Sequence, residues 1–215
     1  MINVLLLSDL HGNYEHIDRF LELNPDMVLI AGDLTDCGPA EGVKDLLAKF
    51  DMPCFVVPGN CDPRDILDVI ERSDAVGLHG SSIDIGAITF TGIGASNPTP
   101  FGTPFELSEE EIDELLVKAK KRMKHNVHNV LVAHAPPLET LDCIGDMHVG
   151  SSSLRAHMED FDLVCCGHIH EEKGIQECGG VTVVNPGMAS EGDCAIIHFG
   201  DAAKEFTIDL ITVSP

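Results

Sequence analysis

The strongest constraint on the fold is a repeated arrangement of five apolar runs, each followed at once by a short polar block. Runs of this length fit strands buried in a sheet. The runs and their blocks are Val4–Leu7 with Ser8–Asn13, Met27–Ala31 with Gly32–Asp36, Cys54–Val57 with Pro58–Asp62, Val130–Ala133 with His134–Pro137, and Leu163–Cys166 with Gly167–His170. Because open α/β sheets bind ligands at the carboxyl ends of their strands, the five blocks are expected to meet there.

Helical patterns separate the first three runs. Their apolar faces are Ile17, Phe20 and Leu21 in the first, Val43, Leu46, Leu47 and Phe50 in the second, and Ile66, Val69 and Ile70 in the third. Asp62 is expected to cap the third helix, since Pro63 follows it as in a first helical turn. The β-α-β-α-β order predicts a parallel sheet.

The second half of the chain contains a further group of expected elements. Residues 92–107 form a long segment rich in Gly, Pro and Thr, and segments of that length are usually functional or disordered. Ser108 with Glu111 forms a capping box that predicts a helix start, and another helix is expected to begin at Ser151. Expected antiparallel strands cover 174–177, 181–184, 194–199 and 205–210. The sequence thus predicts two sheets, the second more antiparallel than the first.

Composition and charge disfavour several classes of protein. The 215 residues are 44% hydrophobic, and 36 acidic against 13 basic side chains give a net charge of −23. Such a charge repels polyanions, so nucleic-acid polymers are unexpected partners, and it fits either a salty cytoplasm or simple solubility. The longest apolar runs are far below the ~20 residues that span a bilayer, and no basic region precedes the first. Eight Cys without a Cys-x-x-Cys pair fit reduced thiols, so we expect a cytoplasmic protein without a membrane partner.

Asp9 and His11 close the first apolar run. In a strand, residues i and i+2 point to the same side, so these two side chains can converge on one metal ion. The same spacing recurs at His168 and His170. Taken alone, an Asp-x-His step is more often an Asp that caps the next helix beside a structural His, so the metal assignment depends on the other blocks.

Taken in order, the blocks Asp-x-His, Gly-Asp, Gly-Asn, His and Gly-His-x-His resemble the calcineurin-like metallophosphoesterase superfamily, from Asp9 to about Gly187. Smaller motifs resemble its compact prokaryotic phosphodiesterase branch, namely 59–62, 148–151, 167–171 and 184–187. The resemblance implies an α/β fold, a four-layer α/β/β/α sandwich of two mixed sheets with the metal site at the carboxyl ends of the strands. It also implies a single metallophosphoesterase domain over residues 1–215.

The resemblance assigns the metal ligands as well. By position in the family pattern they are Asp9, His11 and His170 on one ion, Asn60, His134 and His168 on the other, and Asp33 as the bridge between them. The expected catalytic residues are Asp33, Asn60 and His134. Imidazole, carboxylate and amide donors without a thiolate discriminate poorly among divalent metals; we expect two ions, Mn²⁺ first, with Fe, Zn²⁺, Co²⁺ or Ni²⁺ as alternatives.

Such a site implies phosphoester hydrolysis without a covalent intermediate. Two ions roughly 3.5–4 Å apart can generate hydroxide near neutral pH and clamp the phosphoryl oxygens during in-line displacement. With two Asp ligands and a bridging hydroxide the site would keep a charge of about +1, which attracts a phosphate anion. The expected substrates are small phosphodiesters or nucleotide-like molecules. The sequence leaves the oligomeric state open, a homodimer included.

The chain departs from much of the superfamily at Cys61, where many members have a His that acts on the leaving group. A thiol is a poor replacement, which favours activated phosphodiesters over alkyl monoesters. The leaving-group acid is therefore unassigned. Arg64 and Arg155 lie near helix starts beside motifs and are candidate substrate contacts, although exposed arginines in salt bridges are the commoner case. His148 is a third candidate, because its loop is expected to border the site.

Two alternative functions stand beside the enzyme. A non-catalytic scaffold of the same fold would fit the change at Cys61, but it should have a degraded ligand set, and this chain keeps all seven predicted ligands. A nuclease subunit would need a basic groove or a partner chain to supply one, and the net charge of −23 argues against it.

Overall fold

The computed structural model describes residues 1–214, whose strands form mainly two six-stranded sheets. In spatial order the first sheet contains β14 (Phe206–Thr212), β13 (Asp193–Phe199), β1 (Ile2–Leu7), β2 (Met27–Ala31), β3 (Cys54–Val57) and β4 (Val76–Gly77). The second contains β11 (Gly174–Cys178), β12 (Val181–Asn185), β10 (Leu163–Cys165), β7 (His128–Ala133), β6 (Ile88–Ile93) and β5 (Ser81–Ile85). A separate hairpin joins β8 (Cys143–Ile144) to β9 (Met147–His148).

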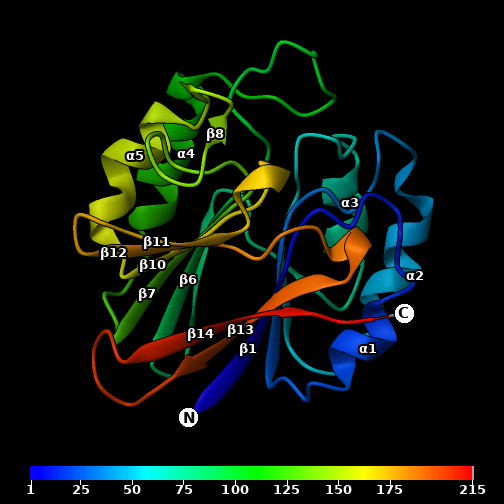
Figure 1. Cartoon of the computed structure of the whole chain (residues 1–215), viewed down its shortest axis with the longest axis horizontal. Coiled ribbons are helices and arrows are strands. Elements are labelled where there is room, and N and C mark those ends of the chain that lie inside the picture. Colours follow the sequence, from blue (N-terminus) through cyan, green and yellow to red (C-terminus); the bar gives the residue numbers. More distant parts are fainter. Residues whose placement is uncertain (215) are drawn as a thin grey trace.

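Helices cover the outer faces of both sheets (Figure 1). The α-helices are α1 (Ile17–Leu21), α2 (Val43–Leu47), α3 (Ile66–Glu71), α4 (Glu109–Lys120) and α5 (Ser152–His157). Short 3₁₀ turns are η1 (Ala40–Gly42), η2 (Met158–Asp160), η3 (His170–Glu172) and η4 (Ala189–Glu191). The first three α-helices pack on the first sheet, while α4 and α5 pack on the second.

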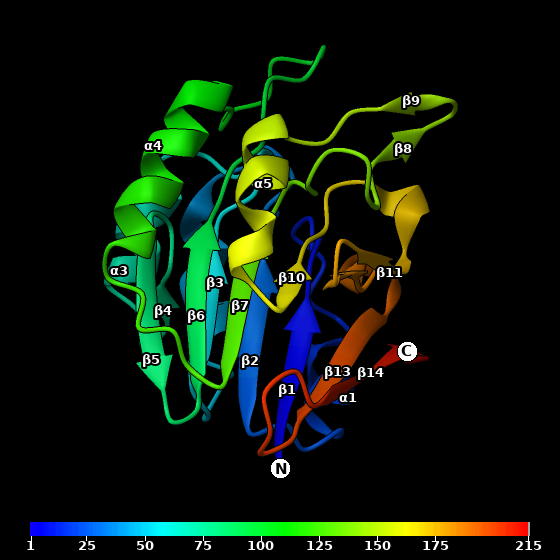
Figure 2. The same ribbon diagram turned by 90° about the vertical axis from the view of Figure 1, so that its left-hand side faces the viewer.

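Three apolar layers hold this arrangement together. They lie between the helices and sheets that Figure 2 shows from the side. Strand β1 shows why, because Val4 and Leu6 face the second sheet while Leu5 and Leu7 lie under the helices. A strand buried on both faces is apolar throughout, as the uninterrupted run in the sequence indicates. The predicted four-layer α/β/β/α sandwich of two mixed sheets is confirmed.

The balance of strand directions differs from the prediction. Each sheet has three parallel and two antiparallel pairings, so the second is no more antiparallel than the first. The C-terminal strands do form two antiparallel hairpins, but β11 and β12 join the second sheet and β13 and β14 join the first. Local alternation predicts strands and hairpins, whereas the choice of sheet depends on contacts with strands far away in the sequence.

The expected helices are present, but Asp62 does not cap the third one. The helix begins after Asp65, and the buried Asp62 carboxylate instead accepts hydrogen bonds from the backbone N–H groups of Gly59, Leu34 and Thr35, at 2.8, 3.2 and 2.7 Å. The prediction was wrong because an Asp-Pro pair has the same local signature whether its carboxylate serves its own helix or a neighbouring loop. Asp62 thus ties together the loops that follow β2 and β3.

The parallel strands of both sheets end at the same edge of the molecule, where the polar blocks follow them. The predicted helix starts are confirmed: Ser108 forms the capping box of α4, and α5 begins after Ser151. Within residues 1–214, none of the helices combines the length and the apolar character needed to cross a membrane.

Candidate metal centre

The seven predicted ligands come together at this edge, and we call them the ligand cluster: Asp9, His11, Asp33, Asn60, His134, His168 and His170. In its first half, His11 Nε2 lies 3.2 Å from His170 Nε2 and 3.7 Å from Asp9 Oδ1. His170 Nε2 lies 3.3 Å from the same Asp9 oxygen. Three donor atoms from three different side chains therefore face one point.

The second half of the cluster lies around His134. Its Nε2 atom is 2.8 Å from Asn60 Oδ1 and 3.4 Å from Asp33 Oδ2, and its ring packs edge-on against His168 with centroids 5.0 Å apart. The same Asp33 oxygen lies 3.7 Å from His11 Nε2. Asp33 therefore faces both halves, which is the position that a bridging carboxylate needs.

The backbone of the cluster is largely left-handed, which the sequence did not indicate. Asp9, His11, Asp33 and His168 have φ angles of 57°, 45°, 51° and 69°. Such angles are rare outside glycine and concentrate at functional sites. The expectation that Asp9 and His11 converge by strand alternation was wrong in its mechanism, because β1 ends at Leu7 and both residues lie in the loop beyond it.

Two glycines let neighbouring loops approach closely. A Cβ atom on Gly59 would lie 2.0 Å from Asp33 Oδ1, and one on Gly167 would lie 1.8 Å from Ser8 Oγ. Real Cβ atoms essentially never come so close to another heavy atom. The glycines that precede Asn60 and His168 in the sequence motifs are thus required by packing of the loops around the cluster.

Hydrogen bonds outside the cluster orient its side chains. His134 Nδ1 lies 2.8 Å from the carbonyl oxygen of Ala31, which directs Nε2 toward Asp33. Asn60 Nδ2 donates to Thr103 Oγ1 at 3.1 Å, and Thr103 Oγ1 in turn donates to Glu106 at 2.7 Å. We did not predict roles for Thr103 and Glu106; the one signal for them was the unusual length of the segment 92–107.

Burial and charge shift the acidities inside the cluster. Asp33 is only 2% exposed. Burial opposes its ionisation, but the charge and hydrogen bond of His134 outweigh burial and hold the pKa of Asp33 below its ordinary value. Burial opposes protonation of His134 and so lowers its pKa. The charge and hydrogen bond of Asp33 outweigh burial and raise the pKa of His134 to about 9. Burial and the neighbouring His134 lower the pKa of His168 to about 4.

The chemistry of these donors fits divalent metal ions. Buried Asp9 and Asp33 carboxylates share a small space with imidazole nitrogens, and such groups are stable together when a cation or a shared proton lies between them. Carboxylate oxygen, amide oxygen and imidazole nitrogen are ordinary ligands of divalent transition metals. The seven residues present therefore suit the predicted metal-binding role.

Cys61 lies beside the cluster. Its backbone N–H donates to Asp33 Oδ1 at 2.8 Å, and its thiol can come within 4.8 Å of donor atoms of His11 and Asp33. Burial, reinforced by the Asp33 carboxylate, raises the pKa of the Cys61 thiol far above its ordinary range. This position therefore holds a protonated, poorly acidic thiol.

The three expected substrate contacts have different surroundings. Arg64 donates to the carbonyl oxygen of Glu106 at 2.8 Å and lies over the ring of Phe105. Arg155 donates to the sulfur of Met158. Both arginines thus hold parts of the protein together, whereas the side chain of His148 is 45% exposed in the β8–β9 hairpin.

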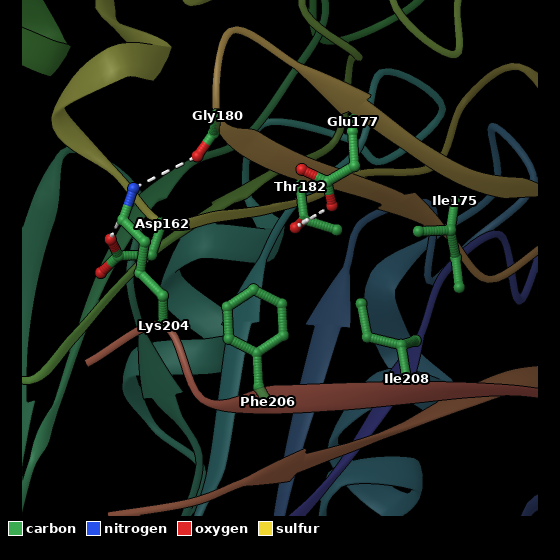
Figure 3. A pocket seen from close by; sticks show the side chains of 8 residues that line it. All are labelled: Asp162, Ile175, Glu177, Gly180, Thr182, Lys204, Phe206 and Ile208. Atoms are coloured by element: carbon green, nitrogen blue, oxygen red, sulfur yellow. Dashed lines mark hydrogen bonds and ion pairs between the residues drawn. The ribbon is translucent and has the colours of Figure 1, made fainter. Parts of the chain in front are cut away.

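A separate hollow of about 370 Å³, here called the edge groove, lies near the start of β10, β12 and β14 (Figure 3). Its lining consists of Asp162, Ile175, Glu177, Gly180, Thr182, Lys204, Phe206 and Ile208. Lys204 is 60% exposed, donates to the Gly180 carbonyl at 3.2 Å and lies 3.7 Å from Asp162. The edge groove contains no residue of the ligand cluster, so this hollow and the candidate metal site are at different places on the molecule.

The chain is similar to several known proteins. The chain is 38% identical to an uncharacterised protein of Methanocaldococcus jannaschii, over 88% of this chain and 89% of that protein. It is 28% identical to a probable glycerophosphodiester phosphodiesterase of Arcobacter nitrofigilis, over 72% of this chain and 60% of that one. A crystal structure from Thermus thermophilus has the same fold, with a TM-score of 0.73, 18% identity and coverage of 97% and 98%.

The family model for calcineurin-like phosphoesterases matches residues 2–172, which include eight complete strands of the two sheets, α1 to α5 and every residue of the ligand cluster. The predicted resemblance is confirmed. The chain belongs to the calcineurin-like phosphoesterases, a family of metal-dependent phosphoester hydrolases, and within it to the compact prokaryotic type.

Proposed function

We propose that this protein hydrolyses small phosphodiesters or nucleotide-like substrates at two divalent metal ions. The observation that carries the proposal is the position of Asp33, whose Oδ2 lies 3.4 Å from His134 Nε2 and 3.7 Å from His11 Nε2. One carboxylate oxygen thus faces donors from both halves of the ligand cluster. That arrangement suits two ions that share a bridging ligand.

The residues would divide between the ions as the family pattern implies. One ion would take Asp9, His11 and His170, the other Asn60, His134 and His168, with Asp33 shared. Two bound ions would supply a nucleophile by acidifying water and would stabilise the phosphoryl oxygens. Mn²⁺ is the first candidate, with Fe, Zn²⁺, Co²⁺ or Ni²⁺ as alternatives, because mixed nitrogen and oxygen donors accept all of these ions.

The chain's own side chains would prepare the site for substrate. The contact with Ala31 fixes the ring of His134, and Thr103 fixes the amide of Asn60, so two ligands are oriented before any ion binds. Mutating a residue that orients a metal ligand in this way usually lowers metal affinity or activity about 10- to 100-fold. Local positive charge at two ions would attract a phosphate diester despite a chain charge of −23.

A diester with an activated leaving group is the favoured substrate class. The Cys61 thiol, with its raised pKa, is a poor proton donor for a leaving alkoxide. The sequence relative from Arcobacter nitrofigilis that is described as a probable glycerophosphodiester phosphodiesterase supports a diester in preference to a monoester.

The test is hydrolysis of bis-p-nitrophenyl phosphate by the purified protein with Mn²⁺. We expect turnover by the parent protein and none above background by Asp33→Asn, because the shared carboxylate is lost. Asp209→Asn, at an exposed position on β14, is the matched control and should behave as the parent. Undetectable turnover by the parent with every divalent metal would contradict the proposal and favour a non-catalytic scaffold.

A further inference from the structure

The proposed function lacks a proton donor for the leaving group, because Cys61 occupies the position from which many relatives use a His. A second acid–base pair lies on the hairpin beside the cluster. His148 Nδ1 is 2.6 Å from Asp142 Oδ1, and the other oxygen of Asp142 accepts the backbone N–H groups of Gly150 and Glu139 at 2.9 and 3.1 Å. Asp142 is fully buried, so its carboxylate is held in place by the backbone and in turn fixes the imidazole.

The hairpin that carries His148 packs beside the turn that carries His170, a member of the ligand cluster. Strand β8 packs against η3, the turn that begins with His170, and Figure 2 shows β8 above that turn. His148 lies opposite Cys143 at the base of the hairpin, not at its tip. On the other side, Asn97 donates to the carbonyl oxygen of Val149 at 3.0 Å, which joins the hairpin to the segment that supplies Thr103. The hairpin is thus attached to the turn that carries His170 and to the segment that orients Asn60.

The surroundings of His148 favour its protonated form. The hydrogen bond that Nδ1 donates to Asp142 raises the pKa of His148, and the charges of Asp142, Glu139 and Glu172 act in the same direction. The thiol of Cys143 also lies close, 3.5 Å from Nδ1. Since Nδ1 faces Asp142, Nε2 is the nitrogen available to a substrate, and it has no hydrogen-bond partner among residues 1–214.

We propose that His148, positioned by the buried Asp142, is the general acid that protonates the leaving group of the phosphodiester. In this step the oxygen of water forms a new P–O bond and the water gives up one proton to solvent, while the bond to the leaving oxygen breaks with its electron pair staying on that oxygen. The proton of His148 Nε2 moves to the leaving oxygen, and the neutral imidazole regains a proton from solvent. The proposal rests on the function proposed above and supplies the residue that Cys61 leaves unassigned.

The experiment compares two substrates that differ in their need for an acid. The parent and His148→Gln are assayed with Mn²⁺ on bis-p-nitrophenyl phosphate, whose leaving group is stable without a proton, and on diphenyl phosphate, whose leaving group is more basic. We expect kcat/KM for diphenyl phosphate to fall about 10²-fold in the variant, within the usual range for a general acid, and a smaller loss for the nitrophenyl ester. His198→Gln is the matched control, because His198 also pairs with a carboxylate, Asp209, but lies beside the start of β1 at the far end of the sheet.

Equal losses on both substrates, or no loss on either, would overturn the role of His148 while leaving the phosphodiesterase proposal intact. No hydrolysis by the parent would overturn both. A second readout does not depend on turnover: an NMR titration of His148 in the metal-free protein should give a lower pKa in Asp142→Asn than in the parent. An unchanged pKa would contradict the positioning role of Asp142.

Discussion

The two ends of the sheets differ in how their polar side chains are held. At the carboxyl ends, Asp9 and His134 are 1% and 0% exposed, and each is fixed by backbone groups from a different loop. At the edge groove, Lys204 is 60% exposed, and its partner Asp162 lies 3.7 Å away. The groove is a clear hollow of about 370 Å³, yet its polar groups satisfy one another at the surface. Buried polar groups that face one another thus indicate a candidate functional site better than an open hollow does.

The largest difference is expected from matched glycine substitutions at the two ends. In Gly167→Ala the new Cβ would meet Ser8 Oγ at 1.8 Å and Asp9 Oδ2 at 2.5 Å, so Asp9 must move. A displacement of about 1 Å can cost about 10²-fold in rate, and we expect at least that loss of Mn²⁺-dependent kcat/KM. In Gly180→Ala, at the groove, φ is +83° with no heavy atom within 4 Å of the new Cβ, so only about 1–2 kcal/mol of backbone strain is expected and activity should persist. Comparable activities of the two variants would remove the distinction between the ends.

The next effect concerns stability of the loops beneath the cluster. Asp62→Asn replaces one acceptor oxygen by an NH₂ group that faces the backbone donors of Gly59 and Leu34. Leaving buried donors unpaired should lower the free energy of unfolding by about 1–3 kcal/mol, measured by urea denaturation. Glu177→Gln at the groove, where the carboxylate accepts only from Thr182 among the hydrogen bonds of residues 1–214, should change it far less. A loss no larger in Asp62→Asn than in Glu177→Gln would show that Asp62 does not tie these loops together.

A smaller effect is expected where Asn60 is oriented. Thr103→Val removes the hydroxyl that accepts from Asn60 Nδ2 but keeps the branched shape of the side chain. We expect about a tenfold loss of Mn²⁺ affinity or of kcat/KM, as for other residues that orient a metal ligand. Thr182→Val makes the same change at the groove and should leave both quantities as in the parent. Parental values in Thr103→Val would mean that Asn60 is oriented without this hydrogen bond.

The smallest effect is a pH dependence that also arises at the carboxyl ends. His79 Nδ1 accepts the N–H of Gly94 at 2.9 Å, and burial together with Arg64 and Lys118 lowers the pKa of His79 from 6.5 to about 4. Between these values the unfolded chain binds the proton more readily, so stability falls as pH drops from 6.5 toward 4. Because the ring is partly exposed, we expect about 1 kcal/mol, and His79→Asn, which keeps an acceptor, should lose that part of the slope. An identical slope in the variant would assign the pH dependence to other groups.

The sequence was sufficient to predict the four-layer architecture and the residues that meet in the ligand cluster. Buried parallel strands are apolar on both faces, so runs such as Val4–Leu7 are visible without any structure, and the polar blocks after them show where the strands end. The order of the blocks then carried the family resemblance. These features are local in the chain or belong to a short motif, which is why they could be predicted.

What the sequence did not reveal depends on contacts between distant segments. Three features have no signature in the local sequence. They are the left-handed backbone of Asp9 and Asp33, the hydrogen bonds of Asp62 to the loop after β2, and the hydrogen bond between Asn60 and Thr103. The hydrogen bond between Asp142 and His148 could not be predicted either, because a six-residue separation fits many loop geometries. Each of these features fixes a side chain through a hydrogen bond or backbone angle that only the assembled loops determine.

The central claim is that the ligand cluster binds two metal ions, and counting them tests it most directly. After loading with Mn²⁺ and removal of free metal, elemental analysis should give about two ions per chain for the parent and clearly fewer for Asp33→Asn. Asp162→Asn, at the edge groove, should retain the parent's metal content. A parent that binds no Mn²⁺ or any alternative metal, or an Asp33→Asn protein that still binds two ions, would contradict the account.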